Sequence, residues 1–174
     1  MRVVGPRYKQ VSSCHNLESI ELRGKGITLQ PNDLHGHAQL KILDLEGCKC
    51  EQLDLSSCRN LIRIELDGER ITLQTNAFHG LAQLKMLKVL WGYICKSLDL
   101  SCHNLESIEL YGERIALQPL AFYGLAQLKI LELKYCKCES LDLSSCHNLE
   151  SIELYGEGIA LQPLAFYGLA QLKM

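Results

Sequence analysis

The chain has 174 residues, of which 47% are hydrophobic, and it carries a formal net charge of −2. This length and hydrophobic content are enough for one elongated domain, and the small net charge offers no bulk attraction for nucleic acid or anionic membrane. No stretch approaches the roughly 18 apolar residues of a spanning helix, so we expect no membrane span in this chain.

The first segment of the chain, residues 1–11, is too short and polar for a secretory signal peptide and shows no recognisable cap. Residues 12–174 are predicted to form one repeat array. Ser12–Asn16 reads as the tail of one unit and Leu172–Met174 as the start of another. We therefore expect an array that is truncated at both ends and that self-associates through its uncapped ends, because solenoids need polar terminal caps.

A leucine opens each unit of the array, and the units alternate between 23 and 21 residues in length. These leucines are Leu17, Leu40, Leu61, Leu84, Leu105, Leu128, Leu149 and Leu172. The true repeat is thus a 44-residue pair of unlike units. Leu105–Gln127 and Leu149–Gln171 differ only at Arg114 versus Gly158. Such self-similarity predicts a repeat architecture and directs the search for function to a repeated surface.

Each longer unit begins L-x-x-I-x-L, whose last two apolar residues lie two apart and so face inward on a short strand. A unit of this size cannot bury its own apolar face and must stack on a neighbour. The return segment begins with Gln-Pro or Ser-Ser, which suits a turn or one turn of helix. In one coil we expect five buried side chains: Leu110, Ile115, Leu117, Phe122 and Leu125.

The pattern Leu105-x-x-Ile108-x-Leu110, with the later apolar positions, resembles the leucine-rich repeat family over nearly the whole chain. The ending A-F-x-G-L, as in Ala77–Leu81, is similar to the typical subclass, which is common in Toll-like receptor, Slit and variable lymphocyte receptor ectodomains. The resemblance implies an α/β fold. This would be a right-handed leucine-rich-repeat solenoid with a parallel β-sheet on its concave face and short turns or single-turn helices on its convex face.

Two columns depart from the asparagine that the family usually places inside the turn. The shorter units hold Cys48 and Cys136 there, and the longer units hold Lys25, Glu69, Glu113 and Glu157. Burying an ionised glutamate is costly, so we expect these charged side chains to point to solvent.

The nine cysteines are predicted to be mostly buried free thiols. Cys14, Cys58, Cys102 and Cys146 form one column, and same-column residues two coils apart are about 10 Å apart, beyond disulfide reach. The C-x-C spacing is too short for a metal site, and no catalytic motif is present, so we expect no metal, cofactor or enzyme activity. Free thiols favour a reducing compartment and the subclass slightly favours an extracellular one, so localisation stays open.

The outward strand positions form a stripe in which six of seven residues are acidic: Glu21, Asp44, Glu65, Lys88, Glu109, Glu132 and Glu153. One interpretation is a solvated ladder relieved by the lysines that precede the strands, Lys41, Lys85 and Lys129. The other is a surface that attracts a basic partner, with Glu65, Glu109, Glu132 and Glu153 as its ligand-binding carboxylates.

Aromatic residues gather beside this stripe in the C-terminal half of the chain. Trp91, Tyr111, Tyr135 and Tyr155 are the candidate anchors, because Trp and Tyr dominate binding hot spots. Alternatively, Trp91 fills a packing defect in the irregular unit Leu84–Asn104, and Tyr111 and Tyr155 stand at the same place in the two near-identical stretches only because the sequence was duplicated.

These observations predict a non-enzymatic module that binds a protein or glycan ligand, and the resemblance implies part of an innate-immune or adhesion receptor ectodomain. The alternatives are an intracellular leucine-rich-repeat scaffold or inhibitor, or a duplicated gene remnant without a selected ligand.

Overall fold

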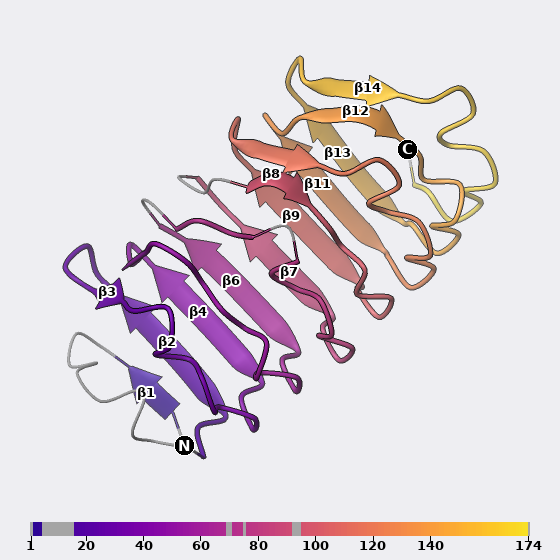
Figure 1. The fold of residues 1–174 in the computed structure, drawn as a ribbon. Helices are drawn as coiled ribbons and strands as arrows, with labels where there is room; N and C mark the ends of the chain where they lie inside the picture. The colour runs from indigo at the N-terminus through magenta and orange to yellow at the C-terminus, as the bar shows by residue number, and fades with distance from the viewer. Residues whose placement is uncertain (1, 5–15, 69–70, 75, 92–94, 174) are drawn as a thin grey trace.

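The computed structural model describes residues 2–4, 16–68, 71–74, 76–91 and 95–173. These residues form a parallel β-solenoid, in which successive coils stack and each places one strand in a long sheet (Figure 1). From β2 (Ser19–Arg23) onward, the strands of this sheet start alternately 23 and 21 residues apart. The predicted repeat period is therefore confirmed.

The main sheet holds eight strands within the described residues, in the order β1-β2-β4-β6-β7-β9-β11-β13. Besides β2, its strands are β1 (Arg2–Val4), β4 (Ile42–Glu46), β6 (Arg63–Asp67), β7 (Met86–Val89), β9 (Ser107–Tyr111), β11 (Ile130–Lys134) and β13 (Ser151–Tyr155). β1 comes from the segment that precedes the array and pairs in parallel with β2. The sheet thus begins one strand earlier than the leucine spacing predicts.

Shorter strands follow the turns that end six of the main strands, β2, β4, β7, β9, β11 and β13. They pair in parallel as β3 (Thr28–Leu29) with β5 (Lys49–Cys50), β10 (Ile115–Leu117) with β8 (Cys95–Leu98), and β12 (Cys138–Leu141) with β14 (Ile159–Leu161). Single bridges, such as Ala116 with Lys137, connect further coils along this second side. The core lies between the main sheet and these shorter pairings.

We expected short turns or single-turn helices on the return side, and with them an α/β class; the described part of the chain contains strands and turns but no helix. The return segments fold through turns whose hydrogen bonds span three residues, as from the amide of Ala77 to the carbonyl of Gln74. Two such segments also contain a leucine with positive φ, 63° at Leu120 and 64° at Leu164. A left-handed residue interrupts a right-handed helix, so a turn is the longest element that fits.

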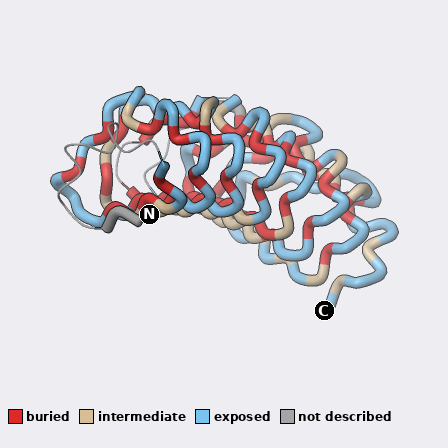
Figure 2. The backbone as a smooth tube through the Cα atoms, turned by 90° about the horizontal axis from the view of Figure 1, so that it is seen from below, coloured by how far each residue is buried: buried red, intermediate tan, exposed pale blue. Residues whose placement is uncertain are grey.

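The core consists of apolar columns that run the length of the stack, shown as buried segments in Figure 2. The leucines that open the units are fully buried from Leu17 to Leu149, and Phe78 and Phe122 are buried between coils. The five side chains expected in the coil after Leu105 are all buried, which confirms that inward pattern. In the last described coil the same column is open, and Phe166 is 41% exposed.

The eight described cysteines are free and buried, whereas Cys14 lies outside the described residues. The thiols of Cys48 and Cys136 donate to the carbonyls of Leu22 and Leu110 at 3.5 and 3.1 Å, so they fill the turn that follows the main strand. The next cysteine column behaves alike, with Cys102 Sγ donating to the carbonyl of Phe78 at 3.1 Å. These thiols tie each shorter unit to the longer unit before it.

An asparagine column reinforces the same connection. The side-chain amides of Asn60, Asn104 and Asn148 donate to the carbonyls of Ala38, Ala82 and Ala126 at 2.8, 2.7 and 2.8 Å. Ser145 adds a double contact, because its hydroxyl donates to the carbonyl of Phe122 and accepts from the amide of Gly124. Each of these bonds joins a longer unit to the shorter unit that follows it.

Candidate functional site

Three of the four predicted aromatic residues meet at the edge of the main sheet, where its strands end. Trp91 follows β7, Tyr135 follows β11 and Tyr155 ends β13. The ring centroids of Trp91 and Tyr135 are 5.4 Å apart, and those of Tyr135 and Tyr155 are 5.0 Å apart in an edge-to-face arrangement. Such pairs add about 0.5–1.5 kcal/mol beyond area burial. We call these three residues the aromatic cluster.

The cluster forms because a glycine separates two of its rings. Trp91 and Tyr135 occupy equivalent places in coils that are two apart, and the coil between them carries Gly112 there. With no side chain at Gly112, the two rings can meet across it. The cluster is accessible, because Trp91 is 53% and Tyr155 59% exposed.

Tyr135 has an unusual backbone. Its φ is +61°, in the left-handed region, whereas the equivalent places in neighbouring coils hold glycines with positive φ, Gly112 and Gly156. A side chain in this conformation costs about 1–2 kcal/mol. Backbone strain of this kind gathers at functional sites. Hydrogen bonding with Tyr155 is the main cause that raises the pKa of the Tyr135 hydroxyl.

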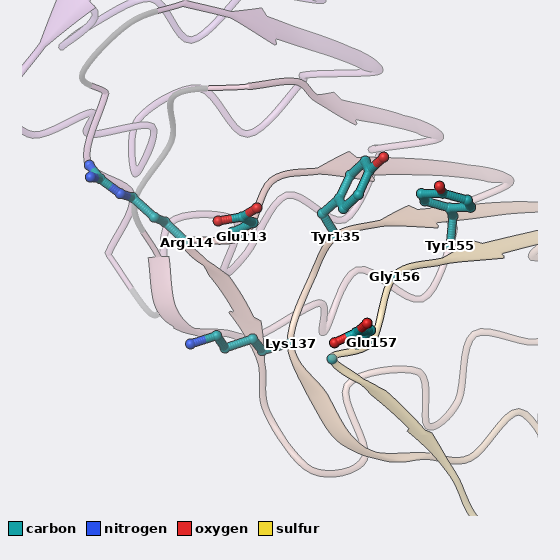
Figure 3. A pocket seen from close by; sticks show the side chains of 8 residues that line it. Glu113, Arg114, Tyr135, Lys137, Tyr155, Gly156 and Glu157 are labelled. Carbon is teal, nitrogen blue, oxygen red and sulfur yellow. The ribbon is translucent and has the colours of Figure 1, made fainter.

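A hollow of about 730 Å³ lies beside the cluster and uses two of its tyrosines as a wall (Figure 3). Its lining is Glu113, Arg114, Tyr135, Lys137, Tyr155, Gly156, Glu157 and Gly158. This volume is within the range of about 300–1,000 Å³ that ligand pockets usually have. Both residues at which the two near-identical stretches differ, Arg114 and Gly158, belong to this lining.

Sequence reasoning found the tyrosines of this hollow but not its charged wall. It did predict that Lys25, Glu113 and Glu157 point to solvent, and all three are exposed, while Glu69 lies outside the described residues. The signal that could have located the wall was the glutamate at the asparagine place of two successive longer units. An expelled side chain at that place emerges at the strand ends, beside the aromatic cluster.

Tyr111 is separate from the aromatic cluster and belongs to a charge network. Its hydroxyl donates to Glu132, and its ring lies under the ammonium group of Lys134, which is 4.9 Å from the ring centroid. The hydroxyl of Tyr111 is the main cause that lowers the pKa of Glu132. Hydrogen bonding with Glu153, 2.5 Å from its Nζ, is the main cause that raises the pKa of Lys134.

The acidic stripe is extensively paired, but not by the lysines that we expected to relieve it. Asp44 pairs with Arg23, Glu65 with Arg63, Glu109 with Lys88, and Glu132 and Glu153 with Lys134. Arg63 and Lys134 relieve a carboxylate two positions away on their own strand. The in-register pairing of parallel strands also brings Arg23 near Asp44 and Lys134 near Glu153 on the next strand.

The lysines that precede the strands form a second ladder with the glutamates of their own column. Lys85 and Lys129 both reach Glu106, at 2.9 and 2.8 Å, and Lys41 reaches Glu18 at 3.5 Å. The two ammonium groups beside Glu106 lower the pKa of its carboxyl to about 2. The charge on the outer face of the main sheet is therefore largely compensated.

Among the described residues, no cluster of three or more His, Cys, Asp or Glu side chains is placed to hold a metal ion. The same residues contain no helix that is long and apolar enough to cross a membrane. Burial raises the pKa of Cys102 and Cys136 to about 12, so these thiols are unsuited to nucleophilic chemistry near neutral pH.

No model of a known protein family matches the chain, and no curated protein matches it.

Proposed function

We propose that this chain is a non-enzymatic ligand-recognition module of the leucine-rich repeat type. Its binding site for a protein partner is the aromatic cluster at the strand-end edge of the main sheet. The observation that carries the proposal is Tyr135, a tyrosine in left-handed backbone at a place where both neighbouring coils use glycine. An interaction outside the fold explains why a strained, half-buried ring stands there.

The surroundings of Tyr135 support the same function. Trp and Tyr are the residues most enriched in binding hot spots, and here three such rings stand together with a hollow beside them. The stripe carboxylates Glu65, Glu109, Glu132 and Glu153 already have partners or close cations, so their part is to steer encounter rather than to anchor the complex.

Two settings are compatible with this function. The resemblance of the repeats to typical leucine-rich repeats favours a receptor ectodomain in innate recognition or adhesion. The eight buried free thiols favour an intracellular scaffold or inhibitor, because reduced cysteines are the rule in the cytosol.

The test compares affinity capture by the wild-type chain and by Tyr135→Gly, using secreted and cytosolic protein fractions separately. Glycine removes the ring contacts and the backbone strain together, and the two effects largely offset each other, so Tyr135→Gly should still fold. We expect it to lose the specific partner, with Trp91→Ala weakening capture by about thirtyfold or more. Tyr123→Ala, on an exposed return turn, is the matched control.

Equal recovery by the wild type and Tyr135→Gly would show that the cluster is not the binding site. A partner from the secreted fraction would support the receptor setting, and a cytosolic partner the scaffold setting.

A further inference from the structure

The charged residues around the hollow differ from those on the strands. The strand charges stand in ion pairs, such as Lys88 with Glu109, whereas Glu113 and Glu157 form no ion pair within the described part of the chain. Both carboxylates are exposed and both line the hollow. They are therefore available to a ligand without breaking an existing contact.

The hollow is polarised rather than uniformly charged. In Figure 3 Glu113 lies to the left of Tyr135 and Glu157 lies below it, and Arg114 and Lys137 extend toward the side opposite Tyr155. A ligand group near Tyr135 thus meets a ring and two carboxylates before it meets either cation.

Two of the residues that line the hollow, Gly156 and Gly158, contribute only backbone. A Cβ at Gly158 would lie 2.7 Å from the carbonyl oxygen of Cys136, so only glycine fits there. The preceding longer unit has Arg114 at the equivalent place, and this single difference leaves that part of the lining without a side chain. Gly156, with φ of +117°, continues the bare surface toward Tyr155.

We propose that this hollow is the subsite for a lysine or arginine side chain of the peptide ligand. The cation would lie beside the ring of Tyr135 and within reach of the carboxylates of Glu113 and Glu157, while the adjoining peptide backbone crosses Gly156 and Gly158. Ring faces attract cations, and carboxylates give charge-assisted hydrogen bonds to ammonium and guanidinium groups. This inference rests on the proposed function and specifies its ligand as a basic peptide segment.

The first experiment selects a displayed random heptapeptide library on the wild-type chain and removes peptides that also bind Tyr135→Gly. The fluorescence of Trp91, the single tryptophan of the chain, then reports binding of the synthetic consensus peptide, because its ring contacts Tyr135. We expect the consensus to carry a lysine or arginine. Replacing that residue with the neutral isostere citrulline or with glutamine should weaken binding.

Substitutions of the glutamates and of the cations that line the hollow then test the subsite, because they should change peptide affinity in opposite directions. Glu113→Gln/Glu157→Gln should weaken the consensus peptide by about three- to tenfold, the size expected for two exposed charge pairs. Arg114→Ala and Lys137→Ala should leave its affinity unchanged or tighten it, since each removes a repulsive charge. Glu51→Gln changes an exposed glutamate that does not line the hollow, and it should have no effect.

The outcomes separate this inference from the function on which it rests. Peptides that need Tyr135 but carry no basic residue, or that ignore Glu113→Gln/Glu157→Gln, would overturn the subsite and leave the aromatic binding edge intact. A library that yields only peptides binding Tyr135→Gly as well as the wild type would overturn the binding edge itself. Selection of sugar rather than peptide ligands in a parallel glycan array would likewise overturn the basic-peptide subsite.

Discussion

Phe122 and Phe166 stand at the same place in two nearly identical stretches, and their surroundings differ completely. Phe122 is 1% exposed because coils cover it on both sides, whereas Phe166 in the last described coil is 41% exposed. The same residue type in the same local sequence thus contributes differently to stability. Position in the stack, rather than local sequence, sets the contribution of a core residue in a solenoid.

We expect Phe122→Ala to lower the free energy of unfolding by about 3–5 kcal/mol, because it leaves a large cavity between coils. Phe166→Ala should cost only about 1–2 kcal/mol, since much of its ring is already in water. Urea denaturation of both variants checks the comparison. Equal costs would mean that the exposed face of the last coil is covered in solution.

The repeat period of the sequence predicts which residues form the core. It does not predict which side chains meet at the surface. The inward columns through Leu110 and Phe122 follow from periodicity alone and are confirmed. The charged wall at Glu113 and Glu157 does not follow, because its place beside Tyr135 depends on the turn that follows each strand. The interpretation that Lys41, Lys85 and Lys129 relieve the stripe was also wrong, because ion pairing depends on side-chain rotamers, which the spacing of residues along the chain does not determine.

At the scale of elements, the cysteine columns hold one coil to the next. Five of the buried thiols donate to a carbonyl of the preceding coil, those of Cys48, Cys58, Cys102, Cys136 and Cys146. Burial is the main cause that raises the pKa of these thiols above the ordinary 9.0, to about 11 for Cys48, Cys58 and Cys146 and about 12 for Cys102 and Cys136. The folded coils therefore favour the protonated thiol.

This shift predicts that the fold weakens at alkaline pH. Since the folded pKa is the higher one, the unfolded chain loses these protons first. The stabilising contribution is complete below pH 9 and is lost as the pH rises toward 11 to 12. Urea midpoints from pH 7 to 11 should fall above pH 9, and Cys102→Ala/Cys146→Ala should fall less steeply from its lower starting value. A thiol reagent should label the native chain slowly and the denatured chain fast.

The strands follow from the leucine period, which places an inward pair in every unit, and their parallel pairing follows from stacking. The return segments were harder to predict, because Gln-Pro and Ser-Ser suit a turn and a helix start equally well. At Leu120 a positive φ produces a turn instead of a helix. The sequence could not predict this φ, because leucine rarely adopts that conformation.

At the scale of the whole molecule, the two sides of a coil are not equally covered. In the last described coil, Leu161 and Phe166 are exposed, although their counterparts Leu117 and Phe122 are buried. Contiguous apolar surface of this kind promotes association.

We therefore expect the chain to self-associate at micromolar concentrations, as sedimentation velocity would show. Leu161→Lys/Phe166→Lys should shift it toward the monomer, because the two ammonium groups oppose burial of this face. Tyr123→Lys, on an exposed return turn, should leave the association unchanged. Persistence of the oligomer in the double variant would place the contact elsewhere.

The thiol, serine and asparagine bonds that tie each shorter unit back to the longer unit before it also constrain how such a chain can change in length. Inserting or deleting 44 residues at a unit boundary recreates every donor–acceptor pairing, so the new stack has the same seams as the old one. Inserting a single unit would stack two units of the same kind on each other. Some asparagine and cysteine side chains would then no longer face the carbonyl that accepts their hydrogen bond in this structure. Growth in steps of two is therefore the route that the fold leaves open, and the near-identical pair of stretches in this chain is what such a step would leave behind.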